Sequence, residues 1–183
     1  AVQTTTISLS SGFGDSTKTV TIHSNAQFNV YRTAYPINKV IVVKDGGTIW
    51  NENDSNIISG PVTLEAGTAT IHVQNGGTIP SLEFQGGISG PGGIVKIGAS
   101  PLRLYGDNAY SGSTLISTGT VFIASGTISN TTPITVGSGA TLNVTCSGPN
   151  VTSNVYLGRT LRNDVGGNIT FTAQPSGGGY TTQ

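Results

Sequence analysis

Residues 88–144 read ISGPGGIVKIGASPLRLYGDNAYSGSTLISTGTVFIASGTISNTTPITVGSGATLNV, and this stretch decides the fold. Short runs of β-branched and apolar residues alternate with Thr, Ser or Lys, as expected of strands that bury one face. Glycine precedes many of these runs, as in STGTVF (117–122) and GSGATL (137–142). The pattern predicts short strands joined by tight glycine turns.

Similar runs continue on both sides of this stretch, and no apolar stripe with a 3.6-residue period persists over three turns of a helix. The chain is therefore predicted to be all-β. Strands are predicted at 18–23, 27–32, 38–43, 47–51, 61–66, 68–74, 78–84, 93–98, 101–106, 113–117, 119–125, 133–137, 140–145 and 167–173.

The predicted connections resemble one another along the chain. DGGTIW (45–50) and NGGTIP (75–80) place glycine just before a β-branched pair, as the turns of 88–144 do. A solenoid that coils one rung on the next requires such a recurring corner. A closed barrel or a two-sheet sandwich fits the number of strands equally well but does not require the same turn at each corner. The sequence favours a β-solenoid.

Composition excludes several classes of function. The chain has 183 residues, enough for one domain, and eight basic residues balance eight acidic ones. Nucleic-acid binding is not expected, because it needs clustered Lys and Arg. No run of 18 apolar residues exists, so no membrane-spanning helix is expected. The start at Ala1 and the absence of Met favour a chain trimmed by a signal peptidase, or a fragment.

The motifs of residues 88–144 have a fixed order. They are Gly-x-Gly, Lys-x-Gly, alternating Leu, Gly-x-Asn-x-Tyr-x-Gly, Thr, Gly-Thr, and a closing Val-x-x-Gly-Ala-Thr-Leu. In this order and spacing they closely resemble the autotransporter-associated β-strand repeat, also called the passenger-associated transport repeat. The departures are Pro101, Arg103 and Val121. The matching residues are Gly90, Gly92, Lys96, Gly98, Leu102, Leu104, Gly106, Asn108, Tyr110, Gly112, Thr114, Gly119, Thr120, Val136, Gly139, Ala140, Thr141 and Leu142.

The resemblance implies a right-handed parallel β-helix in a secreted or surface-exposed bacterial protein, with no catalytic activity. Rungs of about two dozen residues would give seven or eight rungs. The solenoid is expected over 36–175, with 88–144 as the recognised repeat. Residues 1–35 are expected to form an N-terminal cap or an exchanged strand region, and 176–183 a flexible C-terminal tail.

Several residues of the repeat have expected structural roles. Asn108 should bond backbone at a corner, with Tyr110 packed beside it. Gly106 and Gly112 should take conformations closed to other residues. The expected core residues are Leu102, Leu104, Val121, Ile123 and Leu142.

Candidate catalytic residues are scattered along the chain. Only Glu52 and Asp54 lie close together, within WNENDSN (50–56), which is interpreted as a solvated polar loop. His23 and His72 lie in alternating strands without a nucleophile motif or zinc-ligand spacing. No enzyme activity, cofactor or metal is therefore expected.

Aromatic residues, the single cysteine and several asparagines are further candidates for a functional role. Trp50, with Tyr31 and Tyr35, is a candidate aromatic sugar-binding surface, although a core or interface role is the stronger interpretation. Cys146, the single cysteine, is interpreted as a small apolar core residue. Asn-x-Ser/Thr sequons make five residues candidate glycosylation sites, namely Asn53, Asn130, Asn143, Asn150 and Asn168.

The lead functional hypothesis follows from the open strand edges at both ends of a short solenoid. Copies that stack head to tail would cover these edges and generate a fibre. We therefore expect a non-catalytic extracellular subunit of a bacterial surface filament, sheath or fibre, whose partner is itself, with 1–13 as a candidate donated strand. The alternative is a fragment of an autotransporter passenger that acts as an adhesin, with cell-surface glycans as candidate partners. A carbohydrate-active β-helix enzyme is the third hypothesis, and it would need acids clustered on one face.

Overall fold

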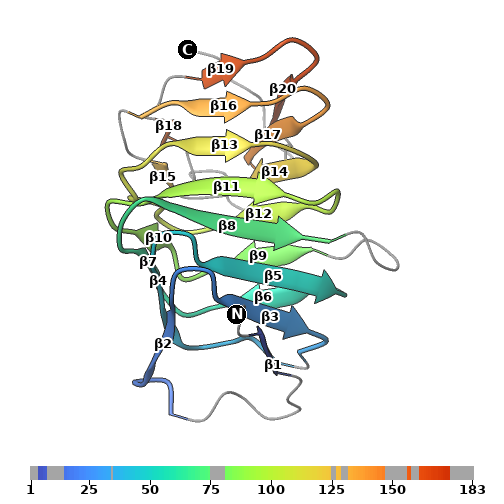
Figure 1. Ribbon diagram of the computed structural model, residues 1–183. Helices are drawn as coiled ribbons and strands as arrows, with labels where there is room; N and C mark the ends of the chain where they lie inside the picture. Colours follow the sequence, from blue (N-terminus) through green and yellow to red (C-terminus); the bar gives the residue numbers. More distant parts are fainter. Residues whose placement is uncertain are drawn as a thin grey trace.

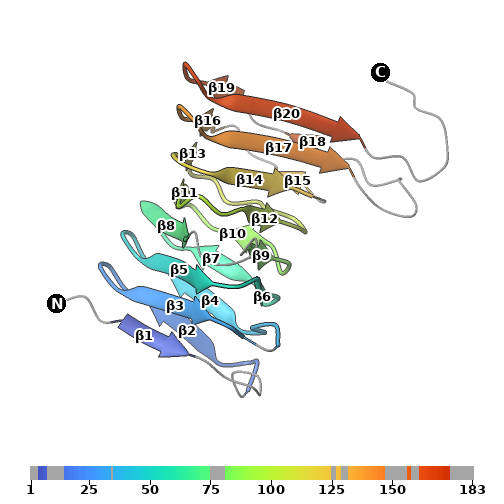
Figure 2. The same cartoon turned by 90° about the vertical axis from the view of Figure 1, so that its right-hand side faces the viewer.

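The strands of the chain pair in parallel and wind along one axis. The computed structural model describes residues 4–7, 15–33, 35–74, 81–124, 127–128, 132–146, 156–157 and 161–173. Every strand pair within them is parallel. The colours of Figure 1 and Figure 2 run in order from β1 at one end of the stack to β19 and β20 at the other. The prediction of a parallel β-solenoid is confirmed, and the barrel and sandwich alternatives are wrong.

Three sheets, here named A, B and C, form the faces of the solenoid. Sheet A has eight strands in the order β1 (Thr4–Ile7), β3 (Gln27–Tyr31), β5 (Thr48–Asn53), β8 (Thr68–Val73), β11 (Gly93–Ile97), β13 (Thr114–Ile116), β16 (Ile134–Val136) and β19 (Leu161–Asn163). Sheet C has six, namely β6 (Asn56–Ile58), β9 (Leu82–Phe84), β12 (Leu102–Leu104), β14 (Thr120–Ile123), β17 (Thr141–Cys146) and β20 (Asn168–Ala173). Sheet B contains β2 (Thr19–Ile22), β4 (Val40–Val43), β7 (Val62–Leu64) and β10 (Ile88–Ser89), and bridges through Asn108 continue it to β15 (Thr127–Ile128) and β18 (Tyr156–Leu157).

Each turn visits the sheets in the order A, C, B. In the described residues about five consecutive turns, from β5 to β18, have strands on sheets A and C and a strand or a bridge on sheet B, fewer than the seven or eight expected. The turn before them, from β3 to β4, is represented on sheet C by a bridge from Ile37 to Ile58 alone. The difference arises at the ends, because within the described residues the turn of β1 has no strand on sheet C, and the turn of β19 and β20 has none on sheet B. Turn lengths also vary, since Ile94 pairs with Thr114 but Ile134 pairs with Leu161.

Apolar side chains of successive turns form columns inside the solenoid. Ile58, Phe84, Leu104, Ile123 and Val144 follow one another in register on sheet C, and all are buried. The burial of such side chains is the main favourable contribution to folding. The core expected from the sequence is confirmed, because its members are all buried: Leu102, Leu104, Val121, Ile123 and Leu142.

Residues with positive φ recur at the corners. At the corner from sheet A to sheet C, successive turns place Gly98, Gly119, Gly139 and Gly166 at φ values between 74° and 85°. Glycine adopts this left-handed conformation without the strain that a Cβ atom causes. The recurring glycines of the sequence are therefore explained by one repeated corner.

Candidate functional site

A buried polar network replaces the apolar lining where β5 meets β6. Asn51 pairs in register with Val30 and Val73, and like them it is buried within the solenoid. Asn56 begins β6 in register with Leu82, and it too is buried. Two amides thus occupy inward-facing positions that apolar residues take on neighbouring turns.

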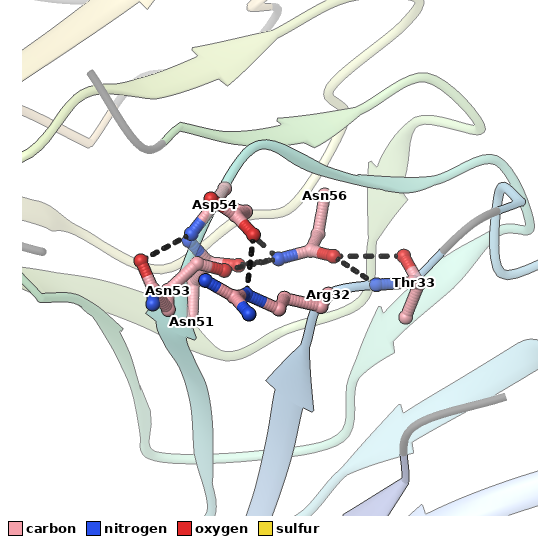
Figure 3. A network of polar contacts seen from close by, with 6 residues as sticks. All are labelled: Arg32, Thr33, Asn51, Asn53, Asp54 and Asn56. Atoms are coloured by element: carbon pink, nitrogen blue, oxygen red, sulfur yellow. Dashed lines mark hydrogen bonds and ion pairs between the residues drawn. The ribbon is translucent and has the colours of Figure 1, made fainter. Parts of the chain in front are cut away.

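Asn56 is the centre of this network (Figure 3). Its Nδ2 donates to Oδ1 of Asn51 at 2.7 Å and to the backbone oxygen of Asn53 at 2.8 Å. Its Oδ1 accepts hydrogen bonds from the backbone N–H and the hydroxyl of Thr33, at 2.7 Å and 2.8 Å. The amide therefore joins two successive turns, and its donors and acceptor are satisfied as buried polar groups require.

Two charged residues form the outer part of the same corner. Arg32 and Asp54 have φ values of 47° and 59°, where later turns have glycine. An ion pair of 2.8 Å joins the Arg32 Nε to the Asp54 Oδ2, and both side chains are exposed by about half. Left-handed backbone at a residue other than glycine costs about 1–3 kcal/mol, whereas an exposed ion pair returns about 0–1 kcal/mol. Strain that its own contacts do not offset is typical of a functional surface.

The interpretation of residues 50–56 as a solvated loop was therefore wrong in part. β5 extends to Asn53, β6 begins at Asn56, and the side chains of Asn51 and Asn56 face the interior. Glu52 is half-buried and Asp54 is exposed, as a solvated segment requires. The amides mislead sequence analysis because their polarity suggests exposure, while their hydrogen bonds allow burial.

The outer face of sheet A beside this corner carries the chain's one tryptophan. Asn29, Trp50 and His72 lie in register on β3, β5 and β8. The rings of Trp50 and His72 stack with centroids 5.7 Å apart and planes 16° apart. The Asn29 Nδ2 donates to the Glu52 Oε2 at 2.6 Å. The indole N–H of Trp50 has no acceptor among the described residues.

The environment of the stacked imidazole favours its neutral form. Burial lowers the pKa of His72, and the nearby charge of Lys96 lowers it further. A neutral imidazole packs on the indole without the cost of desolvating a cation. The stacked pair is therefore an apolar platform with polar groups along one edge.

Lys96 lies inside the solenoid directly behind this face. It pairs in register with Ile71 and Ile116, and its side chain is 0% exposed. Its Nζ donates to the backbone oxygens of Gly98 at 2.6 Å and of Thr118 at 3.0 Å. Burial lowers the pKa of Lys96 from 10.5 to about 8. The lysine of the Lys-x-Gly motif thus links the corner carbonyls of two turns.

This lowered pKa predicts a pH dependence of stability. Between pH 8 and 10.5 the unfolded chain retains the Lys96 proton that the folded chain has lost, so stability rises with pH. We expect the free energy of unfolding of the wild type, relative to Lys96→Met, to rise by about 2 kcal/mol from about pH 7 to about pH 9.5. Urea denaturation of both proteins across this range measures the difference, in which the other titrating groups cancel. Parallel pH profiles would show that Lys96 does not titrate in this way.

The residues of the recognised repeat occupy corners and inner columns. Asn108 continues sheet B by bridges to Ile88 and Ile128, and its Nδ2 donates to the backbone oxygens of Tyr105 at 3.4 Å and Gly106 at 3.1 Å. Gly90, Gly106, Gly119 and Gly139 have positive φ. The remaining residues of the motif are placed as follows: Tyr110, Ala140 and Leu142 are buried, Gly92 packs against Leu64, and Thr120 and Thr141 pair in register on sheet C.

Gly112 lacks the positive φ that Gly106 has, so its position is closed to other residues for a different reason. A Cβ atom built on Gly112 would lie 2.3 Å from the backbone nitrogen of Gly93, so the close approach of the preceding turn requires glycine there. Tyr110 and Asn108 are both buried, and the Tyr110 hydroxyl lies 2.6 Å from the Oγ1 of Thr114.

The other candidate residues are not brought together. Tyr35 and His23 are exposed, and Tyr31 packs under the guanidinium of Arg32, 5.4 Å from the ring centroid. Cys146 ends β17, and its side chain lies outside the described part of the chain. Among the sequons, Asn53 accepts a hydrogen bond from the Asp54 N–H, Asn143 is half-buried on sheet C, Asn168 is exposed, and Asn130 and Asn150 lie outside the described residues.

The described residues contain no group of three or more His, Cys, Asp or Glu side chains arranged to hold a metal ion. Within the same ranges no helix is long and apolar enough to cross a membrane.

Comparison with known proteins finds similarity over part of the chain. It is similar to the Neisserial autotransporter lipoprotein NalP of two serogroup B strains of Neisseria meningitidis, with 31% identity over 102 residues. The match covers 55% of this chain but only 9% of the length of each relative. No model of a known protein family matches the chain, and no solved structure matches it.

Proposed function

We propose that the chain is a solenoid segment of a secreted, surface-exposed bacterial passenger, and that it acts without catalysis as an adhesin. The observation that carries this proposal is the parallel β-solenoid fold of a chain similar to an autotransporter lipoprotein. We expect the winding to be right-handed, as the repeat implies. Each turn adds about 4.8 Å along the axis, so a stack of turns holds binding surfaces away from a cell.

Surface location is tested with antiserum raised against the chain. If the proposal is right, intact source cells bind the antiserum, and protease added outside the cells removes the antigen. The antigen should be larger than 18.6 kDa, the mass of this chain, because a passenger continues beyond it. An antigen that is released only by lysis and resists external protease would overturn the proposal. A cytosolic marker protein serves as the control.

A self-assembling filament subunit is the second candidate function. Phe171 follows Val144 in an inner column of sheet C, yet it is 65% exposed, and Val165 in the same turn, the last one within the described residues, is 96% exposed. Apolar side chains in that position favour a further turn above them, from the same chain or from a second copy. Electron microscopy of the purified chain would show fibres, which deletion of residues 1–13 should shorten or abolish. A monomer at high concentration would exclude this function and leave the passenger proposal intact.

A further inference from the structure

Charged and aromatic side chains, which are few in this chain, lie close together on the outer surface of β3, β5 and β8. Charged residues make up only 9% of the sequence, yet Arg32, Glu52 and Asp54 lie on or beside this surface. The one tryptophan and one of the two histidines form its stacked platform. A turn with a purely structural role does not need so many charged and aromatic side chains on one surface.

We propose that this surface, formed by Trp50, Glu52 and His72 with the buried Asn29 supporting Glu52, is a binding site for a neutral glycan. The inference rests on the proposed adhesive function and names the class of its ligand. Sugar rings present flat apolar C–H faces and a rim of hydroxyl groups. The rings of Trp50 and His72 can contact the apolar face, and the polar groups of Glu52 and its neighbours can contact the hydroxyl groups.

The platform fits the apolar face of a sugar. Trp50 and His72 are two nearly parallel rings from adjacent turns, 5.7 Å apart, and both side chains are half-buried on the outer face of sheet A, so their exposed parts remain available to a ligand. Ile97 follows His72 in register on β11 and extends the apolar strip. Aromatic faces of this kind contribute most of the binding energy at many recognition sites.

The polar edge fits the hydroxyl groups. Glu52 uses one oxygen to accept the hydrogen bond from Asn29, which fixes the carboxylate beside the platform. A carboxylate has acceptor capacity for about four hydrogen bonds, so Glu52 can also accept from a ligand hydroxyl. The indole N–H of Trp50 is buried and has no acceptor among the described residues, so only a rotation of the ring that exposes this group would let it donate to a ligand hydroxyl.

The charges of the site favour a neutral glycan over an acidic one. The exposed Arg32 is paired with Asp54, and Lys96 is buried behind the sheet with its Nζ bonded to backbone oxygens, so neither basic group is free to bind an acidic ligand. Glu52 would repel a uronic acid or sialic acid placed over Trp50. A nucleic acid is disfavoured for the same reason.

Intrinsic fluorescence provides a direct test, because the full chain contains a single tryptophan within the site. Cellohexaose, mannohexaose and chitohexaose are titrated as neutral probes, and a hexamer of galacturonate as the acidic probe. We expect at least one neutral probe to shift or quench the Trp50 emission with saturation. His72→Ala and Glu52→Gln should weaken binding at least about tenfold, which corresponds to about 1.4 kcal/mol.

Phe122→Ala is the matched control, because Phe122 is an outward aromatic on β14 of sheet C, under the Arg103 guanidinium. It should bind as the wild type does. Should His72→Ala fail to show the wild-type circular dichroism spectrum, His72→Gln takes its place. The proposal is overturned if no neutral probe changes the emission, if only the acidic probe binds, or if the His72 and Glu52 variants bind like the wild type. Surface exposure of the antigen does not depend on this result, so the two proposals fail separately.

Discussion

Replacement of Phe84 by alanine is expected to lower the free energy of unfolding by about 3–5 kcal/mol. Phe84 is fully buried in an inner column of sheet C, between Ile58 below and Leu104 above. Its removal leaves a cavity that spans three turns, and parallel strands held in register on both sides cannot collapse into it. Chemical denaturation followed by circular dichroism at 25 °C measures the loss.

Phe122→Ala supplies the comparison for Phe84 on the outer face of the same sheet. Phe122 is only half-buried and packs against Arg103, so the loss should be about 1 kcal/mol. Equal losses for the two variants would contradict the assignment of the inner and outer faces of sheet C.

Replacement of Gly98 by alanine is expected to cost about 3–4 kcal/mol. Gly98 has a φ of 85°, and a Cβ atom there would lie 2.1 Å from the backbone oxygen of Val73 in the preceding turn. The backbone strain and the steric clash each contribute about 1–3 kcal/mol. Equilibrium denaturation of the variant measures the sum.

Gly139→Ala isolates the contribution of backbone strain. Gly139 occupies the equivalent corner with a φ of 74°, but a Cβ atom there would meet nothing within 4 Å. We expect a loss of about 1 kcal/mol. If Gly98→Ala were no more destabilising than Gly139→Ala, this result would contradict the close approach of successive turns at Gly98.

The regular part of the fold was predictable from the sequence because it depends on local patterns. Alternating Thr and β-branched residues indicate strands, and glycine marks the corners that need positive φ, such as Gly98 and Gly119. The short strands β6, β10, β15, β18 and β19 were not predicted. Strands of two or three residues have too little alternation to be distinguished from turns, and neighbouring turns hold them in place.

The candidate site was less accessible to sequence reasoning because it depends on register. Trp50 and His72 are 22 residues apart, and only the parallel pairing of β5 with β8 stacks their rings. One signal was available: Thr48-Ile49-Trp50 and Thr70-Ile71-His72 share a Thr-Ile pair, and their alignment places the two rings together. Lys96 had no comparable signal, because an alternating strand with apolar residues on both faces does not reveal which face is buried.

The stacking of successive turns in register is the claim on which the site and its ligand depend, and a pair of cysteines tests it most directly. Thr48 and Thr70 are register partners on the outer face of β5 and β8. Their Cα atoms should lie about 4.8 Å apart, within the range of about 4.4–6.8 Å that a disulfide spans.

In a Cys146→Ser background, Thr48→Cys with Thr70→Cys should oxidise to one intramolecular disulfide, detected by mass spectrometry of the folded protein. Thr48→Cys with Val95→Cys should stay reduced, because Val95 follows Thr70 one turn further on. A disulfide in the second pair, or none in the first, would contradict the described winding.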